Sequence, residues 1–384
     1  MSAVKEPVVI HKGLDNVYVK ESNISFIDGE ASRLFYRGYS IEDLAKSSSY
    51  EETAFLLIYG HLPTKSALQD FTHRLESYRP LEPAVLQLVR SFPVSSHPMD
   101  VLRTAISALA LYDPQPATDD IDARVDKALR ILGKTPTIIA AFDRLRNGKE
   151  LLTPRAGSSH ATDFLYLLSG QQPDAYDAHV MDVALILHAE HEMNASTFSC
   201  TVTASTLADM YSIMTAGIGT LRGPLHGGAN EAALKTVLEV GEPGKAEAYV
   251  AQAIAQKKKI MGFGHRIYKT WDPRYKILKS MGEELAKSKG QEQLFETASA
   301  IETTALKHLA GSPIFPNVDS YSGVVFHMLG IPTDLFTPVF AMSRIAGWTA
   351  HVLEYLQSNR LIRPKAHYIG EISLPYISIA DRKP

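Results

Sequence analysis

A histidine followed by two glycines is a candidate reactive side chain. In the segment GPLHGGANEAAL, residues 223–234, His226 lies between a Pro-Leu pair and Gly227 and Gly228. Pro224 and the two glycines interrupt regular backbone, whereas the segment from Asn230 onward is typical of the first turns of a helix. We therefore expect His226 at the threshold of a helix.

Two further histidines, His188 and His191, occur in the segment LILHAEHEMNAST. Their spacing of three predicts one face of a helix, flanked by Glu190 and Glu192. Zinc is a possible ligand for such a pair, but neither the H-E-x-x-H nor the H-x-x-E-H order is present. A substrate contact, a supporting role beside the site and plain core packing remain open for these residues.

A fourth histidine follows a glycine pair in GFGH, inside KKKIMGFGHRIYKTWDPR at residues 257–274. The glycines resemble the start of a dinucleotide fingerprint, but Ile267 stands where the third glycine belongs, so a nicotinamide enzyme is disfavoured. The cations around His265 would lower its pKa and attract phosphates and carboxylates. A solvated basic face would explain the lysines, although it would not explain the glycine-shaped turn.

An aspartate stands among turn-forming residues in PNVDSYSG, residues 316–323. Apolar residues enter and leave this segment, so Asp319 is held between two buried stretches. Such an aspartate is commonly a loop former. Together with the histidines elsewhere in the chain, however, it is also a candidate general base.

The remaining sequence predicts helices that would position these groups. Apolar residues recur at helical spacing in TAFLLIYG, PAVLQLVRSF, DVLRTAISALALY, DARVDKALRIL, DFLYLLSG and VMDVALILHAEH. Stretches rich in proline and glycine separate them, as in loops between packed helices. Residues 17–27 alternate and residues 33–39 are short and aromatic, which predicts small strands near the N-terminus.

The apolar segment at residues 331–356 is long enough to cross a membrane. It carries Asp334, Arg344, His351 and Glu354, however, and such charges are costly at the centre of a bilayer. We expect a buried helix of a soluble protein, in which Arg344 requires an explanation.

Length and composition favour a two-domain globular protein of 384 residues, 45% of them hydrophobic. The net charge of −3 argues against a nucleic-acid binder. Cys200 is the only cysteine, so a disulfide within the chain is excluded and a reducing compartment is favoured. The N-terminal residues lack the features of a signal or transit peptide, and we expect a cytoplasmic protein.

Taken together, these stretches resemble the citrate synthase family over nearly the whole chain. The blocks that carry the resemblance, in the family's order, are FIDGEASRLFYRGYSIEDL, HAEHEMNAST, GPLHGGANEAAL, GFGHRIYKTWDPR, FPNVDSYSG, AMSRIAGWTAH and RLIRPKAHYIG. The resemblance implies an all-α fold of two helical domains with minor strand content at the termini. Residues 1–223 and 331–384 would form the large domain, and residues 224–330 the inserted small domain.

The resemblance also assigns the catalytic residues. Asp319 would remove a proton from the methyl group of acetyl-CoA, and His226 would donate a hydrogen bond to the enolate oxygen. A thioester methyl is a very weak acid, so the developing charge must be stabilised. At a helix N-terminus His226 would be a neutral electrophile, because the positive end of the helix dipole disfavours imidazolium. His265 would polarise and protonate the ketone of oxaloacetate.

Binding residues follow from the same resemblance. Forked guanidinium donors suit the two carboxylates of oxaloacetate, which gives the buried Arg344 a reason. The implied oxaloacetate contacts are His191, Arg274, Arg344, Phe340 and Arg363, the last supplied by the other subunit. His188 would support His191, and Phe340 could equally be core packing. The implied contacts of the CoA phosphates are Lys257, Lys258, Arg266 and Lys269.

The resemblance implies a homodimer with composite active sites that uses acetyl-CoA and oxaloacetate, with no metal or redox cofactor; the CoA thioester is a substrate. The strand domain of the larger, NADH-regulated members is missing, which puts hexamers and NADH inhibition in doubt. The family's 2-methylcitrate synthases, which use propionyl-CoA, share these blocks. A non-catalytic CoA- or acid-binding scaffold is a third interpretation, disfavoured by the presence of Asp319, His226 and His265.

Overall fold

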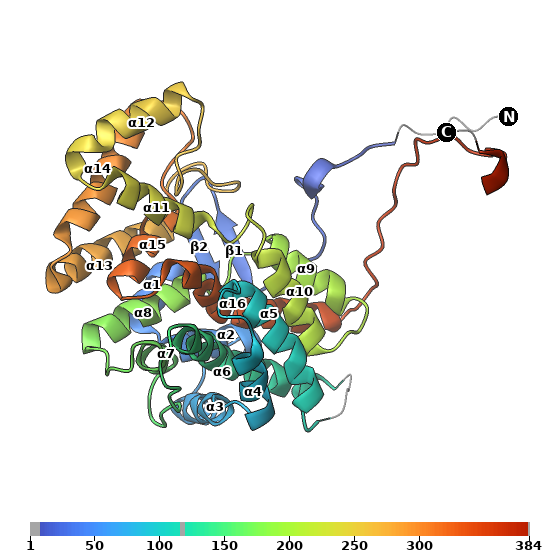
Figure 1. Ribbon diagram of the computed structural model, residues 1–384, viewed down its shortest axis with the longest axis horizontal. Coiled ribbons are helices and arrows are strands. Elements are labelled where there is room, and N and C mark those ends of the chain that lie inside the picture. Colours follow the sequence, from blue (N-terminus) through green and yellow to red (C-terminus); the bar gives the residue numbers. More distant parts are fainter. Residues whose placement is uncertain (1–7, 116–119, 383–384) are drawn as a thin grey trace.

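The computed structural model describes residues 8–115 and 120–382, and within them the chain is mainly α-helical, as predicted (Figure 1). The larger group of helices consists of α1 (Ile41–Ser47), α2 (Tyr50–Tyr59), α3 (Lys65–Tyr78), α4 (Pro83–Ser91), α5 (Pro98–Leu109), α6 (Ile121–Arg146), α7 (His160–Ser169), α8 (Ala175–His188), α9 (Ala195–Ala204), α10 (Met210–Leu221) and α16 (Phe336–Leu356). The second group consists of α11 (Ala229–Val240), α12 (Ala246–Ala255), α13 (Pro273–Lys289), α14 (Glu292–His308) and α15 (Asp319–Met328).

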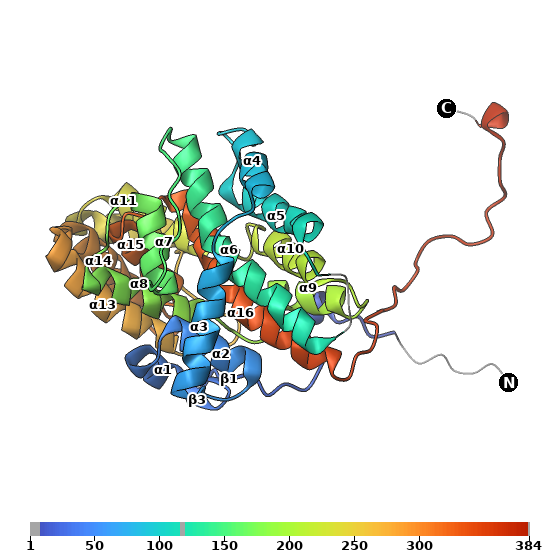
Figure 2. The same cartoon turned by 90° about the horizontal axis from the view of Figure 1, so that it is seen from below.

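Helices α11 to α15 pack on one another and gather at one end of the molecule in both views (Figures 1 and 2). They also contact the larger group, where α13 packs on α1 and α8 and where α11 packs on α16. The division into a large domain and an inserted small domain at residues 224–330 remains a prediction.

Polar residues just before the helices determine where many of them start. A side-chain oxygen that accepts an N–H of the first turn satisfies a donor that the helix itself cannot. Eight helices of the larger group and one of the second group begin in this way, after Ser40, Ser49, Thr64, Asp120, Ser159, Asp174, Asn194, Asp209 and Asp272. Helix α5 begins after His97, whose ring nitrogen accepts instead.

A small antiparallel sheet covers part of the helical core near the N-terminus. Its strands are β1 (Ser25–Asp28), β2 (Arg33–Tyr36) and β3 (Tyr39–Ser40), with Phe26 opposite Phe35. The prediction of a strand over residues 17–24 was wrong, because strand pairing begins only at Ser25. In the described part of the C-terminal segment, residues 357–382, there is no strand either.

Helix α16 runs through the centre of the large helical group and packs on α2, α6, α8 and α9. Nearly all of it is buried, including Trp348 and Arg344. Among the described residues no helix combines the length and apolar character needed to span a bilayer. The apolar run at residues 331–356 is therefore the core helix that was expected.

Two arms leave this body on the same side (Figures 1 and 2). Residues 8–19 and residues 357–382 are almost entirely exposed and contain only short turns. The C-terminal arm carries large apolar side chains in the open, and Ile369 and Tyr376 are 89% and 87% exposed. Such surface is unusual for a protomer that stays alone in water.

Candidate active site

His226 lies in the turn that precedes α11, whose N-terminal cap is Gly228. Its Nε2 accepts the backbone N–H of Ser196 at 3.3 Å and lies 2.8 Å from the Ser196 hydroxyl. Because a backbone N–H can only donate, the neutral ring carries its proton on Nδ1. Burial, and then the charge of Arg344, lowers the pKa of His226 to about 4, so the ring is uncharged at neutral pH.

The helix that acts on His226 is not the one the sequence suggested. Ser196 belongs to the first turn of α9, so the N-terminus facing the ring is that of α9 rather than α11. The next residue, Gly227, is needed for close approach, since a Cβ there would lie 2.4 Å from the Leu221 carbonyl oxygen.

His188 and His191 do not share a helical face, which corrects the sequence prediction. Helix α8 ends at His188, and His191 lies in the connection to α9, where Glu192 adopts a positive φ of 57°. The His188 ring is buried and donates through Nδ1 to the Ala184 carbonyl at 2.7 Å. The chain has left the helix before it reaches His191, because Asn194 already caps α9.

The ring of His191 instead meets the loop that carries His265. The two ring centroids are 5.0 Å apart in an edge-on contact, and His191 Nε2 lies 3.4 Å from the Tyr268 hydroxyl. Burial, and then the charge of Arg274, lowers the pKa of His191 well below its ordinary value. Among the described residues no cluster of histidine, cysteine and carboxylate groups has the arrangement of a metal site.

His265 is held in a defined orientation by its own loop. Its Nδ1 accepts the N–H groups of Ile267 at 3.1 Å and Tyr268 at 3.2 Å, so the neutral ring presents an N–H at Nε2. Burial, and then the nearby Arg274 charge, lowers the pKa of His265 to about 4. His265 can therefore donate a hydrogen bond without being positively charged.

The GFGH loop is tied to the segment that leads to Asp319. Gly264 N–H donates to the Phe315 carbonyl at 2.8 Å, and the Asn317 side-chain amide donates to the Gly264 carbonyl at 2.8 Å. Gly262 has a φ of +81°, and a Cβ there would lie 2.7 Å from the Cα of Ser320. Gly262 thus serves close backbone packing, and Gly264 serves a positive φ of 82°.

Asp319 is the first residue of α15, so it is not merely a loop former. Its N–H donates to the side-chain oxygen of Asn317 at 3.0 Å, which fixes the start of the helix. Burial raises the pKa of Asp319 to about 6, against the opposing effect of Arg274 and Arg344. A carboxylate with this pKa is ionised at neutral pH and is a stronger base than an ordinary aspartate.

Arg274 is bound by a carboxylate that the sequence analysis did not identify as a site residue. Asp272 accepts from Arg274 Nε at 3.0 Å and from Nη2 at 2.7 Å, and both side chains are buried. The same carboxylate accepts the N–H of Val318 at 3.2 Å, next to Asp319. The Asp-Pro pair before α13 signals a helix cap, but nothing local signals the contact with residue 318.

Arg344 is only 2% exposed, and its Nε donates to the His188 carbonyl at 2.7 Å. Within residues 8–115 and 120–382, no carboxylate lies at ion-pair distance from its guanidinium group. Burial lowers the pKa of Arg344 to about 10, so it remains a cation. Phe340 is half-buried and faces this cation, with its ring centroid 4.5 Å away.

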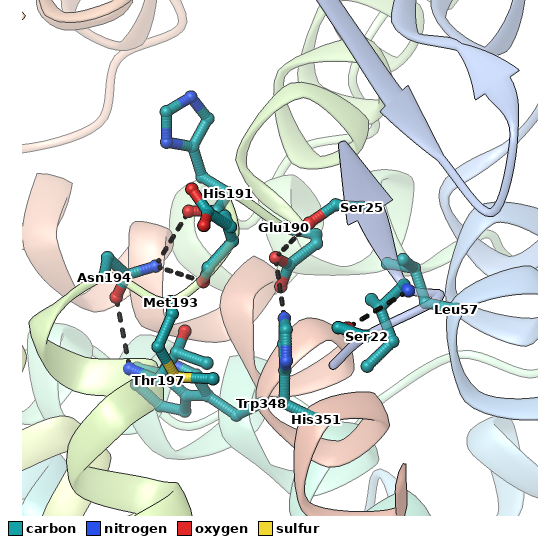
Figure 3. A network of polar contacts seen from close by, with 12 residues as sticks. Ser22, Ser25, Leu57, Glu190, His191, Met193, Asn194, Thr197, Trp348 and His351 are labelled. Atoms are coloured by element: carbon teal, nitrogen blue, oxygen red, sulfur yellow. Dashed lines mark hydrogen bonds and ion pairs between the residues drawn. The ribbon is translucent and has the colours of Figure 1, made fainter. Parts of the chain in front are cut away.

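A buried carboxylate, Glu190, lies behind this cation and was also missed. Glu190 accepts from Ser25 at 3.0 Å and contacts His351 Nε2 at 2.9 Å (Figure 3). The ring of His191 points away from the Glu190 carboxylate, so these consecutive residues contact different parts of the molecule (Figure 3). Next along the loop, Asn194 binds the carbonyl of His191 and caps α9.

The remaining predicted residues lie outside this buried cluster. Arg363 is exposed on the C-terminal arm, next to Ile362, whose N–H donates to the Ser205 hydroxyl at 3.1 Å. The cations of the predicted CoA region, Lys257, Lys258, Arg266 and Lys269, are exposed. Of these, Arg266 approaches Asp15 at 3.7 Å.

The cluster of buried arginines and half-buried His226, His265 and Asp319 has a composition that suits carbon-acid chemistry beside an anionic substrate. The charge of Arg344 acts on both His226 and Asp319, and that of Arg274 acts on both His265 and Asp319. A base, two neutral N–H donors and a buried cation without an ion-pair partner therefore share one region. Together with the two-group helical fold, this defines a class of enzyme that forms a carbanion and stabilises the neighbouring oxygen.

Comparisons with known proteins identify the family. The family model described as citrate synthase, C-terminal domain, matches residues 13–365, and the chain belongs to the citrate synthase family. It is 44% identical to a citrate synthase of Synechocystis, covering 97% of this chain and 94% of that protein. It is 46% identical to a citrate synthase of Acidithiobacillus ferridurans, covering 96% and 98%. A 2-methylcitrate synthase of Corynebacterium glutamicum is 40% identical, covering 97% and 98%.

Solved structures agree in fold. A citrate synthase from Pyrobaculum aerophilum superposes with a TM-score of 0.92 at 44% identity, covering 97% of this chain and 95% of the other. A citrate synthase from Thermoplasma acidophilum, solved in a ternary complex with carboxymethyl coenzyme A and oxaloacetate, superposes with a TM-score of 0.92 at 36% identity, covering 97% of this chain and 100% of the other. The all-α, citrate synthase-like fold expected from the sequence is thereby confirmed.

Proposed function

We propose that the protein is a citrate synthase, which condenses acetyl-CoA with oxaloacetate and hydrolyses the resulting thioester to citrate and CoA. The observation that carries this proposal is the grouping of Asp319, His226 and His265 around two buried arginines. Similarity to citrate synthases along almost the entire chain supports the same reaction.

Proton removal is the first step of the proposed mechanism. Asp319 takes a proton from the methyl group of the thioester, and His226 donates from Nδ1 to the oxygen on which negative charge develops. The ring is already neutral and its Nε2 is occupied by Ser196, so Nδ1–H is the group left to face the substrate. A donor placed in advance in a buried site stabilises the enolate more than water would.

The enolate carbon then attacks the ketone carbon of oxaloacetate. His265 donates from Nε2 to the ketone oxygen and transfers its proton as the carbon-carbon bond forms, since Nδ1 is already bound to two backbone N–H groups. The product of this step is still a thioester. Water attacks its carbonyl carbon, and CoA leaves as the thiol.

The two carboxylates of oxaloacetate would be bound by Arg344, Arg274 and His191, with Arg363 of the partner completing the site. Arg344 supports this assignment because a buried guanidinium without an ion-pair partner favours an anionic ligand. Phe340 would flank the substrate next to Arg344. The exposed cations Lys257, Lys258, Arg266 and Lys269 would contact the CoA phosphates.

We further propose a cytoplasmic homodimer with composite active sites. The exposed apolar side chains of the C-terminal arm favour association with a second copy, which would also bring Arg363 to the partner's site. Cys200 is a free, buried thiol, which suits a reducing compartment. The proposed chemistry uses no metal or redox cofactor, so activity should persist in excess chelator.

Release of CoA thiol from acetyl-CoA and oxaloacetate, followed with a chromogenic disulfide reagent, tests the proposal. Because Cys200 is buried, the folded protein should contribute little background. We expect turnover that falls on the order of 10²–10⁴-fold in Asp319→Ala. Absence of thiol release by the parent protein would refute the proposal.

Comparison of kcat/KM for acetyl-CoA and propionyl-CoA decides between citrate and 2-methylcitrate synthesis. The alternative deserves a direct test because 2-methylcitrate synthases are among the relatives at 40% identity. One methyl group changes binding by only about 1–3 kcal/mol, or roughly 10–200-fold in kcat/KM. A clear preference for acetyl-CoA is expected, and a preference for propionyl-CoA would reassign the substrate.

A further inference from the structure

A buried carboxylate outside the site connects the two helices that carry Arg274 and Asp319. Glu302, on α14, is 5% exposed. Its Oε1 accepts the hydroxyl hydrogen bond of Tyr275. Its Oε2 accepts from Tyr321 at 2.6 Å and from Lys279 Nζ at 2.7 Å. Three donors from α13 and α15 therefore converge on a single side chain.

The two tyrosines of this cluster lie in the first turns of their helices. Tyr275 directly follows Arg274 in the first turn of α13, and Tyr321 comes two residues after Asp319 in the first turn of α15. Their ring centroids are 5.6 Å apart. Each hydroxyl thus holds the beginning of a helix whose first residues line the proposed active site.

In these hydrogen bonds the tyrosine hydroxyls donate and the Glu302 carboxylate accepts. Burial, and then the hydrogen bond to Glu302, raises the pKa of Tyr275. Burial, and then the Glu302 charge, raises the pKa of Tyr321. Both hydroxyls therefore keep their protons and donate, while Lys279 balances the charge of the carboxylate. A buried carboxylate with three donors is satisfied and resists displacement.

A second link joins the same two helix starts closer to the substrate. Asp272 binds the Arg274 guanidinium group and accepts the N–H of Val318, the residue before Asp319. Asp272 holds one point at the start of α15, the N–H of residue 318. Glu302 fixes a second point, one helical turn further along α13 and α15.

We propose that Glu302 is a positioning residue that sets the placement of Asp319 relative to Arg274 by holding Tyr275 and Tyr321 on one carboxylate. The inference rests on the proposed function, because it concerns the base and the cation of that reaction. It concerns geometry alone, since Glu302 contacts the site only through the two tyrosines. A misplacement on the order of 1 Å at reacting groups can lower a rate about 10²-fold.

Three variants test the proposal: Tyr275→Phe, Tyr321→Phe and Glu302→Gln. The first two keep the rings and remove one donor each, so they remain informative if Glu302→Gln does not fold. Glu296→Gln is the matched control, because Glu296 is an exposed acid on the same helix. The parent protein is measured in parallel, and its activity tests the proposed function independently of the ratios between variants.

We expect kcat to fall about tenfold in the single-tyrosine variants and further in Glu302→Gln, with KM for acetyl-CoA little changed. The acid limb of the pH profile should move to higher pH in all three, because Arg274 lowers the pKa of Asp319 and would lie farther from it. Glu296→Gln should match the parent in both measurements.

A purely structural role predicts a different result. In that case the melting temperature falls, while kcat per folded protein and the acid limb remain those of the parent. Unchanged kcat and an unmoved acid limb in the folded tyrosine variants would overturn the proposal while leaving the citrate synthase assignment intact.

Discussion

The two buried arginines of the site, Arg274 and Arg344, are held in opposite ways. Arg274 stands at the start of α13 and is bound on two nitrogens by Asp272. Arg344 stands in the middle of α16, donates to one carbonyl and faces an aromatic ring, and no carboxylate pairs with it in the described part of the chain. One cation is therefore neutralised by the protein, whereas the other has no ion-pair partner among the described residues.

This difference suggests that Arg274 contributes mainly to the stability of the site and Arg344 mainly to the proposed binding of substrate. The Asp272–Arg274 pair fixes the loop geometry before any substrate arrives, because breaking a buried pair leaves an uncompensated charge. Arg344 is buried but has no ion-pair partner, so its desolvation lowers the stability of the free protein. Under the proposed function, an anionic substrate would reduce that cost when it binds.

The largest expected effect comes from replacing each arginine by methionine. Arg274→Met should destabilise the protein by about 3–5 kcal/mol, because Asp272 stays buried without its partner. Arg344→Met should raise the melting temperature, because it removes a buried cation that has no ion-pair partner. The nearby Glu190 keeps its contacts with Ser25 and His351. Thermal unfolding of both variants measures the contrast, and equal destabilisation by the two would contradict it.

A double variant provides the control for the first of these changes. Asp272→Asn combined with Arg274→Met removes both charges of the pair, so it should be more stable than Arg274→Met alone. If the double variant is as unstable as the single one, charge burial is not the cause.

Oxaloacetate should distinguish the two cations by ligand-induced stabilisation. A ligand at 100 times its Kd stabilises the folded protein by about 2.7 kcal/mol. We expect the parent to melt at a higher temperature with oxaloacetate and Arg344→Met to show almost no such shift. Calorimetric scans with and without the ligand give the result, and an undiminished shift in Arg344→Met would remove that residue from the site.

The activity should show one acid limb from Asp319 and none from the histidines above about pH 5. The raised pKa of Asp319, about 6, means that kcat/KM for acetyl-CoA falls tenfold per pH unit below that value and is level above it. His226 and His265 have pKa values near 4 and stay neutral throughout this range. If the acid limb keeps the same midpoint in Asp319→Glu, the titrating group is another residue.

The same carboxylate predicts a pH dependence of stability. Between the ordinary pKa of 3.8 and about 6, the unfolded chain has lost the proton that the folded protein retains. Asp319 therefore reduces stability increasingly as pH rises through this window, with the full cost above it. Asp319→Asn should raise the melting temperature at pH 7.5 and have less effect at pH 4.5.

The smallest effect is expected at Ser196. Ser196→Ala removes the hydroxyl 2.8 Å from His226 Nε2 but keeps the backbone N–H that fixes the tautomer. We expect kcat to fall by less than about tenfold, since a neutral hydrogen bond contributes about 0.5–1.5 kcal/mol. Steady-state kinetics measure this change, and a loss as large as that of Asp319→Ala would mean that the hydroxyl itself takes part in the reaction.

Local sequence patterns identified most of the groups that the fold brings together. His226 and His265 could be recognised from the sequence because they lie next to glycines, which are common in tight turns. Arg344 could be recognised because a charged residue is rare inside an apolar helix. Helical spacing likewise predicted α16 and most of the core. These features depend on neighbours within a few residues.

Other features depend on contacts between distant segments, and no local pattern reveals them. Three-residue spacing suggested one helical face for His188 and His191, but tertiary packing ends α8 between them. The helix facing His226 is α9 and not its own, and Asp272 reaches residue 318 across the fold. The family resemblance assigned the proposed catalytic residues, but it did not point to Asp272, Ser196, Glu190 or Glu302.

The C-terminal arm has a consequence for how the protein would be handled at low concentration. Arg363 is exposed on the C-terminal arm, and in the proposed dimer each active site would receive this cation from the other protomer. Substrate affinity then becomes linked to self-association by mass action. Specific activity should decline on dilution below the dissociation constant of the dimer, and saturating oxaloacetate should hold the two chains together.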